Sequence, residues 1–523
     1  MSKQNTTKNK DKKSNSQSKG IKNVIPVVKV IDKKAMVDPQ MKDRNQYHIY
    51  PDNNHYFNGQ YFTCTLNKSD LNKNNNKYEI IQLLEHDTNG SMVLFLRWGR
   101  VGYTLGTSIK NVNSVTGPKL FMKKYKDKTI NHSYQEIFID YEAEISKEDL
   151  EKKEKKEKQS KKPKKKFVSN LDKDVIDLIK LIYDKKIIDD NLYELGYDSK
   201  KMPLGKLSSS TLMNGLNILK KIEEELKNDN PNKENLEKFS SQFYSQIPHN
   251  FGYRKMANFV IDSKEKIQEK IDMVNSLRDM KITLHILEES VDNEEYENKE
   301  EKQLYDCYKK LNCDIRSISE DEEIYSKLNK YLTAKIESDE YYDYYEKLSL
   351  IKAYEIKRFG ENEKFKDFGN KKLLWHGSRI TNFVGILSQG LRIAPPEAPS
   401  SGYLYGKGVY FADISQKSAN YCCPVNNEAL ILLGEVSLGK EDERYNTDYN
   451  LPKTLKEGTN SVHALGSLEP SEGEMINGDV YIPYGDAKKN NDGKSFYYGD
   501  YAEYIVYDVD LIKLRYLLKI KYN

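Results

Sequence analysis

The sequence LLWHGSRITNF (residues 373–383) decides the fold of the C-terminal part of the chain. It opens with a Leu-Leu-Trp run of the kind that forms a buried strand. His376, one of only eight histidines, stands at the end of that run and is followed by Gly377 and Ser378, which need little room. A histidine beside an apolar strand is more often a satisfied core residue than a ligand, and this stretch alone favours that interpretation.

The composition is that of a water-soluble protein with several domains. A chain of 523 residues has room for about three domains of about 150 residues each. Charged residues make up 31% and apolar residues 37%, and the mean hydropathy is −0.81. No apolar run approaches the roughly 18–20 residues that a membrane helix needs. The N-terminal sequence MSKQNTTKNKDKK lacks the apolar core of a signal peptide, so we expect an intracellular protein with no membrane partner.

The cysteines give no sign of a disulfide framework or a metal site. They are odd in number, scattered, and never form a CxxC pair, which speaks against zinc fingers. We expect free thiols in a reducing compartment and no bound metal. The five positions are Cys64, Cys307, Cys313, Cys422 and Cys423.

The net charge of +4 hides two strongly basic segments. Residues 1–45 contain twelve Lys or Arg against four Asp or Glu, and residues 151–166 contain ten Lys against three Glu. The rest of the chain is therefore net acidic. Basic arms on an acidic body favour contact with a polyanion or nuclear import, and a merely solvated Lys-rich tether is the alternative.

Periodicity divides the chain into five segments. KYEIIQLLEHD (77–87) and SMVLFLRWGRVGYTLG (91–106) predict strands, whereas STLMNGLNILKKIEEEL (210–226) has the three-and-four spacing of an amphipathic helix. EALILLGEVSLG (428–439) again predicts a strand in an extensive sheet. We therefore expect a disordered basic arm over 1–45, a compact sheet domain over 46–143, a Lys-rich linker over 144–167, a helical bundle over 168–295 and an α+β domain over 296–523.

Two glycine-containing loops resemble standard nucleotide-binding motifs, but each lacks a glycine that its motif requires. YGKGVYFAD (405–413) has Phe411 where the third glycine of a dinucleotide fingerprint should stand. KKNNDGKS (488–495) has Lys488 where a phosphate-binding loop needs its first glycine. A bound nucleotide would need a different cradle.

Several longer motifs, in order along the chain, resemble the poly(ADP-ribose) polymerase family. Residues 373–422 and the C-terminal sequence YAEYIVYDVDLIKLRYLLKIKY (501–522) resemble its catalytic signature. MPLGKLSSSTL (202–212) and FYSQIPHNFG (243–252) resemble its helical regulatory domain, and RWGRVG (97–102) its Trp-Gly-Arg (WGR) domain. The resemblance implies a multidomain α+β chain: a small WGR α/β domain, an all-α autoinhibitory bundle and a mixed α+β ADP-ribosyltransferase domain. It matches the shorter, DNA-dependent members that lack N-terminal zinc fingers.

The resemblance implies an enzyme that breaks the bond between nicotinamide and ribose in NAD⁺, its donor substrate, without a metal. Glu503 would bind the nicotinamide ribose, stabilise the cationic transition state and polarise the acceptor hydroxyl; with His376 and Tyr410 it forms the catalytic set of polymer-forming members. Gly377 and Ser418 would hold the nicotinamide carboxamide, and Tyr421 and Tyr410 would pack on its ring. His376 would also bind the adenine-side ribose. The other donor-binding residues implied are Ser378, Asn382, Arg392 and Tyr403.

The resemblance also implies DNA-binding and regulatory residues. Trp98 would stack near a DNA end and Arg100 would bridge to phosphate. Asp272 and Asp279, seven residues apart on KEKIQEKIDMVNSLRDM (264–280), would lie on one face of the helix that covers the NAD⁺ site until DNA binds. Asn275 stands where an acidic residue is expected, which leaves the strength of autoinhibition open.

The implied function is a nuclear, DNA-break-activated ADP-ribosyltransferase that modifies itself and chromatin proteins and that forms polymer. Two alternatives remain: a transferase of single ADP-ribose units, and a non-catalytic scaffold that binds DNA ends. The acceptor-side loop NSVHALGSLEP (460–470) has His463-Ala464 where Lys-Gly is expected, so acceptor choice stays open.

Overall fold

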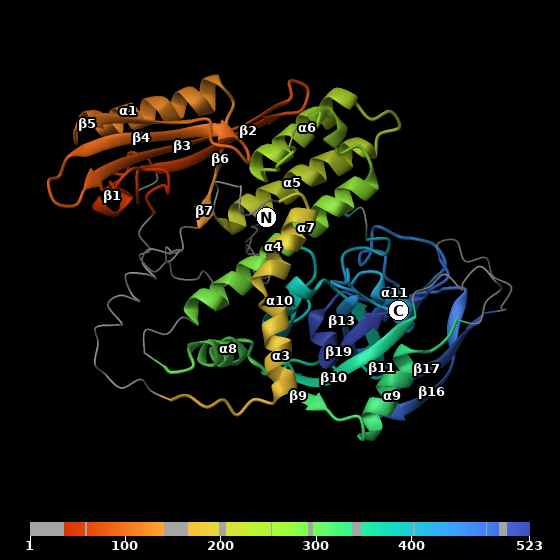
Figure 1. The fold of residues 1–523 in the computed structure, drawn as a ribbon. Coiled ribbons are helices and arrows are strands. Elements are labelled where there is room, and N and C mark those ends of the chain that lie inside the picture. Colours follow the sequence, from red (N-terminus) through yellow and green to blue (C-terminus); the bar gives the residue numbers. More distant parts are fainter. Residues whose placement is uncertain are drawn as a thin grey trace, which may run out of the picture.

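The computed structural model describes most of the chain as three connected parts (Figure 1). The arm over 1–35 and the linker over 141–165 lie outside the described residues, so the predictions made for them stay predictions. Within the described residues, no helix is both long enough and apolar enough to cross a membrane. The structure describes residues 36–57, 60–140, 166–197, 206–252, 254–290, 296–336, 347–400, 403–476, 478–490 and 499–523.

The first part is an antiparallel sheet with a helix on one face. The strands run in the order β5-β4-β3-β2-β6, and β1 pairs with β3. Helix α1 contacts β3 and β4 and closes a core that includes Phe62, Leu94 and Phe121. The elements are β1 (Tyr47–Ile49), β2 (Thr63–Asp70), β3 (Asn75–His86), β4 (Met92–Arg100), β5 (Gly106–Val112), α1 (Thr116–Lys126) and β6 (Gln135–Ile137).

The last ten residues of the expected basic arm, 36–45, are packed rather than disordered. Asp38 is buried and its carboxylate lies 2.8 Å from the guanidinium of Arg97 on β4. Met41 is also buried, in a small core with Ile49 and Phe95. A buried ion pair needs both partners, so this segment completes the sheet domain.

The second part is a helical bundle. The helix expected from periodicity over 210–226 is present as α5, and the segment 264–280 lies in α7. Ser208 and Asn232 cap the N-termini of α5 and α6. Helix α7 continues well past the quoted segment, to Glu289. The elements are α3 (Lys173–Ile182), α4 (Lys185–Glu194), α5 (Ser209–Leu226), α6 (Lys233–Gln246), α7 (Lys264–Glu289) and α8 (Lys299–Lys310), with a two-strand contact between β7 (Ile139–Asp140) and β8 (Lys206–Leu207).

The sheet domain supplies partners for the C-terminal end of α6. The last carbonyls of a helix have no partner within it. Here the Asn67 amide of β2 donates to the carbonyls of Tyr244 and Ser245, at 3.0 Å each, and the Asn76 amide donates to the carbonyl of His249 at 2.9 Å. The first two parts are therefore joined by buried hydrogen bonds as well as by a common apolar core.

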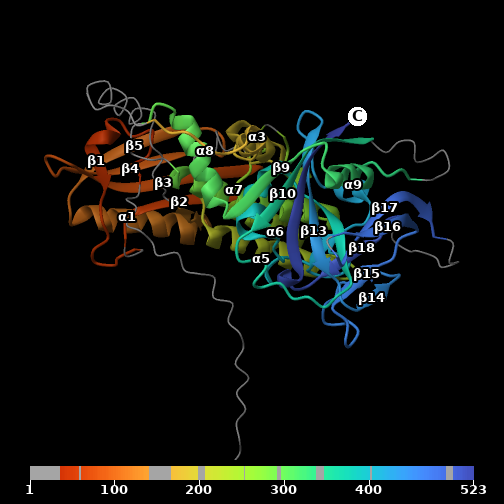
Figure 2. The same ribbon diagram turned by 90° about the horizontal axis from the view of Figure 1, so that it is seen from below.

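The third part is an α+β domain built on two sheets (Figure 2). A seven-stranded sheet has the order β16-β17-β11-β13-β19-β10-β9, and a four-stranded sheet the order β12-β18-β15-β14. Its strands are β9 (Cys313–Ile318), β10 (Leu348–Arg358), β11 (Lys371–Gly377), β12 (Val409–Phe411), β13 (Glu428–Ser437), β14 (Glu441–Arg444), β15 (Ser461–Ala464), β16 (Leu468–Ile476), β17 (Val480–Lys489), β18 (Glu503–Val506) and β19 (Ile512–Tyr522). Its helices are α9 (Glu323–Leu332), the short η5 (Ile380–Asn382), α10 (Phe383–Gln389) and α11 (Ser415–Ala419).

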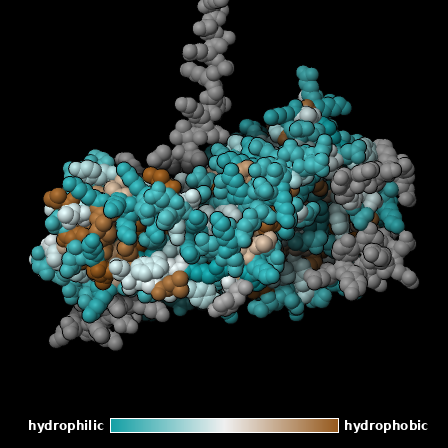
Figure 3. Space-filling view, turned by 90° about the horizontal axis from the view of Figure 1, so that it is seen from above, coloured by the Kyte–Doolittle hydropathy of each residue, from teal (hydrophilic) through white to brown (hydrophobic). Residues whose placement is uncertain are grey.

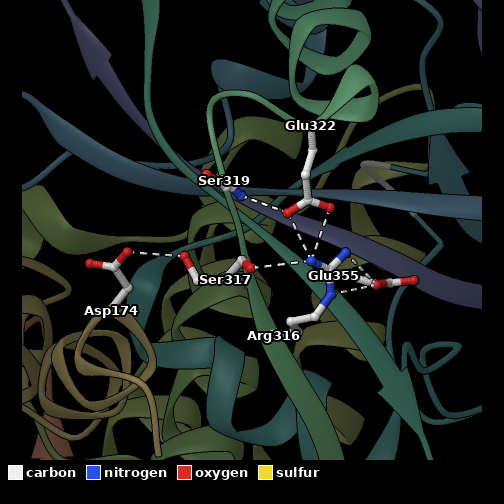
Figure 4. A network of polar contacts seen from close by, with 6 residues as sticks. All are labelled: Asp174, Arg316, Ser317, Ser319, Glu322 and Glu355. Carbon is white, nitrogen blue, oxygen red and sulfur yellow. Dashed lines mark hydrogen bonds and ion pairs between the residues drawn. The ribbon is translucent and has the colours of Figure 1, made fainter.

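Helix α3 packs on this third part and on α8, whereas α5 and α6 share a core with the sheet domain. The apolar face of α3 shares a core with β9, β10 and α10. The Asp174 carboxylate accepts hydrogen bonds from Ser317 at 3.0 Å and from Lys352 at 2.8 Å. Figure 4 shows how Arg316, beside Ser317, is in turn held by Glu322 and Glu355.

Candidate active site

The end of strand β11 is the centre of the candidate site. A Cβ built on Gly377 would lie 1.8 Å from the carbonyl oxygen of Ser418, so no side chain fits there. The Ser418 hydroxyl, buried at the α11 turn, donates to the carbonyl of Trp375 at 3.0 Å. The glycine is thus required because α11 presses directly on the strand end.

His376 is held as a neutral imidazole with one free acceptor nitrogen. Its Nδ1 lies 2.9 Å from the carbonyl oxygen of Tyr410, and because a carbonyl only accepts, Nδ1 carries the proton. Burial lowers the pKa of His376, although the Tyr410 hydrogen bond acts to raise it. The ring packs beside Phe411. Nε2 is therefore an acceptor, which suits a ribose hydroxyl.

Tyr410 is fixed at both ends. Its carbonyl orients His376, and its hydroxyl donates to the carbonyl of Gly406 at 2.6 Å and accepts from the amide of Tyr405 at 3.0 Å. Burial raises the pKa of Tyr410, so the phenol stays protonated. The ring of Tyr403 lies 6.2 Å away, which brings two predicted donor-binding tyrosines together.

Glu503, the first residue of β18, is paired with a lysine that the sequence analysis did not select. The Lys417 ammonium lies 2.8 Å from the Glu503 carboxylate, and their side chains are only 24% and 13% exposed. Burial acts to lower the pKa of Lys417, but the charges of Glu503 and Tyr421 and the hydrogen bonds to them together outweigh burial, so the pKa is raised. Lys417 also lies 6.0 Å from the ring of Tyr421, which is 57% exposed. The sequence contains one feature that could have pointed to Lys417: it is the one charged residue of α11 and directly precedes Ser418.

The residues predicted for the adenosine half of the donor also lie together. The Asn382 amide nitrogen donates to the Ser378 hydroxyl at 3.0 Å. The Asn382 amide oxygen is buried, and among the described residues it has no hydrogen-bond partner. A buried acceptor of this kind is normally satisfied, so it is a natural contact for a ligand hydroxyl or amine.

Helix α7 lies against this half of the site. Asp279, buried on α7, forms an ion pair with Arg392, and a Cβ built on Gly385 of α10 would lie 2.8 Å from the same carboxylate. Burial, together with the neighbouring charge of Arg278, lowers the pKa of Arg392 to about 10. The predicted regulatory residue Asp279 and the predicted donor-binding residue Arg392 are therefore direct partners.

The other α7 residues singled out from the sequence face Tyr403. Burial raises the pKa of Tyr403 to about 12, and the negative charge of Asp272 adds to the rise. Asn275 hydrogen-bonds the same tyrosine, so the amide that stands where a carboxylate was expected still contacts the site. Asp272 itself is exposed to solvent and accepts a hydrogen bond from Gln268 at 2.7 Å.

Trp98 and Arg100 lie apart from this site, on the sheet domain. They are two residues apart on β4 and so share a face. Trp98 is 38% exposed, and the nearby Tyr103, Leu105 and Ile109 are also exposed. Figure 3 shows apolar side chains gathered at the sheet-domain end of the molecule. Arg100 donates to the carbonyl of Asn74 at 3.0 Å.

His463, in the loop expected on the acceptor side, is held by Glu441 and Tyr504. Its Nδ1 lies 3.1 Å from the Glu441 carboxylate, and its ring stacks on Tyr504 at 4.3 Å between centroids.

Three family models match consecutive segments of the chain. The WGR domain matches residues 62–138, the poly(ADP-ribose) polymerase regulatory domain residues 169–308 and the poly(ADP-ribose) polymerase catalytic domain residues 322–522. The three parts of the fold coincide with these matches, as the resemblance in the sequence implied.

Curated relatives match almost the whole chain. Poly [ADP-ribose] polymerase 2 of Homo sapiens is 35% identical over 94% of this chain and 84% of its own length. Poly [ADP-ribose] polymerase 2 of Arabidopsis thaliana is 35% identical over 94% and 77%, and poly [ADP-ribose] polymerase 2-B of Oryza sativa subsp. japonica is 34% identical over 94% and 76%.

Proposed function

The chain belongs to the poly(ADP-ribose) polymerase family and is an NAD⁺ ADP-ribosyltransferase, and on that premise we propose that DNA strand breaks activate it to build ADP-ribose polymer on itself and on nuclear proteins. The observation that carries the proposal is that His376 is hydrogen-bonded to Tyr410, that β18, which begins at Glu503, pairs with the strand of Tyr410, and that α7 forms an ion pair with Arg392.

The donor is held by the residues at the end of β11. The Gly377 backbone and the Ser418 hydroxyl bind the nicotinamide carboxamide, and the exposed ring of Tyr421 stacks on the pyridinium. The Nε2 acceptor of His376 binds a hydroxyl of the adenine-side ribose. The buried Asn382 oxygen, Ser378 and Arg392 line the adenosine half.

Glu503 carries the chemistry. The glycosidic bond breaks with its electron pair leaving on nicotinamide, and positive charge develops on the ribose. The Glu503 carboxylate stabilises that charge and binds the ribose 2′-hydroxyl. It also orients the acceptor hydroxyl, whose oxygen bonds to the anomeric carbon as its proton is lost. Lys417 fixes the orientation of Glu503, because its ammonium lies 2.8 Å from that carboxylate.

The regulation is proposed to pass from the sheet domain to α7. DNA meets Trp98 and Arg100, where an exposed aromatic ring and a cation fit a strand end and its phosphate. Asp279 of α7 forms an ion pair with the guanidinium of Arg392, and α7 also interacts with Tyr403. NAD⁺ that binds Arg392 and Tyr403 therefore competes with α7 for these two side chains. We place the protein in the nucleus, as expected of an enzyme that acts on broken DNA and chromatin.

Automodification with labelled NAD⁺, with and without nicked DNA, tests the proposal. We expect long products only when DNA is present, and we expect Glu503→Gln to abolish elongation while DNA binding is retained. Products of a single unit would favour the mono-ADP-ribosyltransferase. Unchanged turnover of Glu503→Gln would contradict the assigned role of Glu503, and no turnover by the wild type under any condition would favour a DNA-binding scaffold.

A further inference from the structure

A group of buried, ionisable residues lies directly behind Glu503, on the opposite face of its strand. Successive side chains of a strand point to opposite faces, so Tyr504 points away from the donor site. Tyr504 is 4% exposed, and it lies between β12 and β15 in the four-stranded sheet, opposite Phe411 and His463.

The Tyr504 ring and hydroxyl are held from three directions. The His463 ring stacks on one face at 4.3 Å and 15° between planes. The Lys372 ammonium of β11 lies 4.6 Å from the ring centroid. The hydroxyl lies 3.1 Å from the carboxylate of Asp413, which is itself buried. A tyrosine held by a stack, a cation and a hydrogen bond has little freedom to shift.

Glu441 joins the holding residues to one another. One of its oxygens lies 3.1 Å from His463, and the other accepts from Lys372 at 3.3 Å and from Asn370 at 2.8 Å. These contacts connect β14, β15 and β11. Although burial acts to raise the pKa of Glu441, the His463 hydrogen bond and the Lys372 charge lower it to about 2, so it is a permanent anion.

We propose that Glu441, His463, Lys372 and Asp413 form a clamp on Tyr504 that positions Glu503 for reaction. The proposal rests on the role proposed above for Glu503. Adjacent strand residues are about 3.3 Å apart, so movement of Tyr504 also moves the backbone of Glu503 and displaces its carboxylate. A displacement of about 1 Å of a catalytic group can cost up to about 100-fold in rate.

The clamp predicts a particular kinetic effect. Glu503 acts mainly on the transition state, whereas the donor is bound chiefly by His376, Gly377, Asn382 and Ser418, which are not members of the clamp. Loosening the clamp should therefore lower kcat and leave KM for NAD⁺ nearly unchanged. A residue that only stabilises the fold would lower the fraction of active protein, and kcat per active molecule would then be unchanged.

Two conservative variants of the full chain test the clamp at saturating nicked DNA. Glu441→Gln keeps the size of the side chain and removes the anion, and Tyr504→Phe keeps the ring and removes the bond to Asp413. For each we expect kcat to fall about 5- to 20-fold, with KM for NAD⁺ within about two-fold and DNA affinity unchanged. Tyr354→Phe is the matched control, because this buried tyrosine makes one hydrogen bond, to the carbonyl of Asp174, far along the sheet. It should keep the wild-type kcat.

Three results would overturn the clamp. The first is that Glu441→Gln and Tyr504→Phe both retain kcat within two-fold while Glu503→Gln is inactive. The second is a loss of kcat that is fully explained by a smaller DNA-binding fraction of the protein. The third is that Glu503→Gln itself turns over like the wild type, which removes the premise and identifies the failure as that of the proposed function.

Discussion

Asp279→Asn should raise the activity that the enzyme shows without DNA. Asp279 is the α7 residue that pairs with Arg392, and the pair is possible only while α7 lies on the site. The side chain of Asp279 is 9% exposed and that of Arg392 is 32% exposed. Asparagine keeps the shape of the side chain, so the variant removes the charge with little loss of packing.

The size of the effect follows from this burial. Removing one partner of a fully buried pair costs about 3–5 kcal/mol, whereas an exposed pair contributes about 0–1 kcal/mol. Since Arg392 is about one-third exposed, we assign about 1–2 kcal/mol to the pair. This free energy stabilises only the closed state, in which α7 lies on the donor site. Each 1.4 kcal/mol changes the ratio of closed to open molecules about tenfold. The DNA-independent rate should rise about 5- to 30-fold, while the rate at saturating DNA stays the same.

The assay is nicotinamide release without DNA and with saturating nicked DNA. Asp262→Asn is the matched control, because it removes the same charge from an exposed pair with Lys266, just before α7. An equal rise in both variants would mean general loosening of the helix. An unchanged basal rate in Asp279→Asn would refute the reasoning, because the ion pair would then not hold the enzyme closed.

Two further predictions concern the DNA surface and the buried carboxylate. Trp98→Ala should weaken binding of nicked DNA about 5-fold or more, since a stacked base contributes about 1–3 kcal/mol, and Arg100→Ala should lower the dependence of affinity on salt by about one phosphate contact; unchanged DNA titrations would contradict both. Burial raises the pKa of Asp413 to about 6, so the stability it contributes is complete below about pH 4 and is lost as the pH rises through 6. Asp413→Asn should thus be more stable than wild type at pH 7.5, by up to about 3 kcal/mol, and lose this advantage at pH 4.5 in thermal unfolding; a difference independent of pH would contradict the assignment.

The local features of the site were predictable, and its long-range partners were not. The Leu-Leu-Trp run before His376 and Gly377 predicted a buried strand, and the ligand-binding roles of His376, Gly377 and Tyr410 came from the family resemblance. The Lys417–Glu503 ion pair was not predicted, because it depends on α11 and β18 meeting through the packing of the sheets. Periodicity reports which face of an element is buried but does not report what lies against it.

The N-terminal boundary of the sheet domain could not be predicted from the sequence either, because it also depends on long-range contacts. Residues 36–45 carry two basic and two acidic residues, unlike the strongly basic residues before them, but ten residues with no apolar periodicity do not predict order. Their order comes from Asp38 meeting Arg97 and from Met41 entering an apolar core. Both partners lie far along the chain, so a compositional argument misses them.

Two apolar cores meet along α7. This arrangement would allow α7 to move away from the donor site at one point while the rest of the bundle stays folded. Ile267, Ile271 and Val274 of α7 belong to the core shared with the sheet domain, whereas Ile286 belongs to the core shared with the catalytic domain. Asp279 lies between these two sets. On the side of the catalytic domain, α3 is fastened through Asp174, and on the side of the sheet domain the carbonyls that end α6 accept hydrogen bonds from that domain.

A movement of the sheet domain on DNA would therefore first disturb α6 and the N-terminal half of α7, while α3 and the C-terminal end of α7 stay attached to the catalytic domain. The strain would concentrate where the two cores meet, next to the Asp279–Arg392 ion pair. Because that pair is partly exposed and contributes only about 1–2 kcal/mol by the argument above, a small part of the free energy of DNA binding is enough to break it. The site can then open at Arg392 without unfolding of the whole bundle.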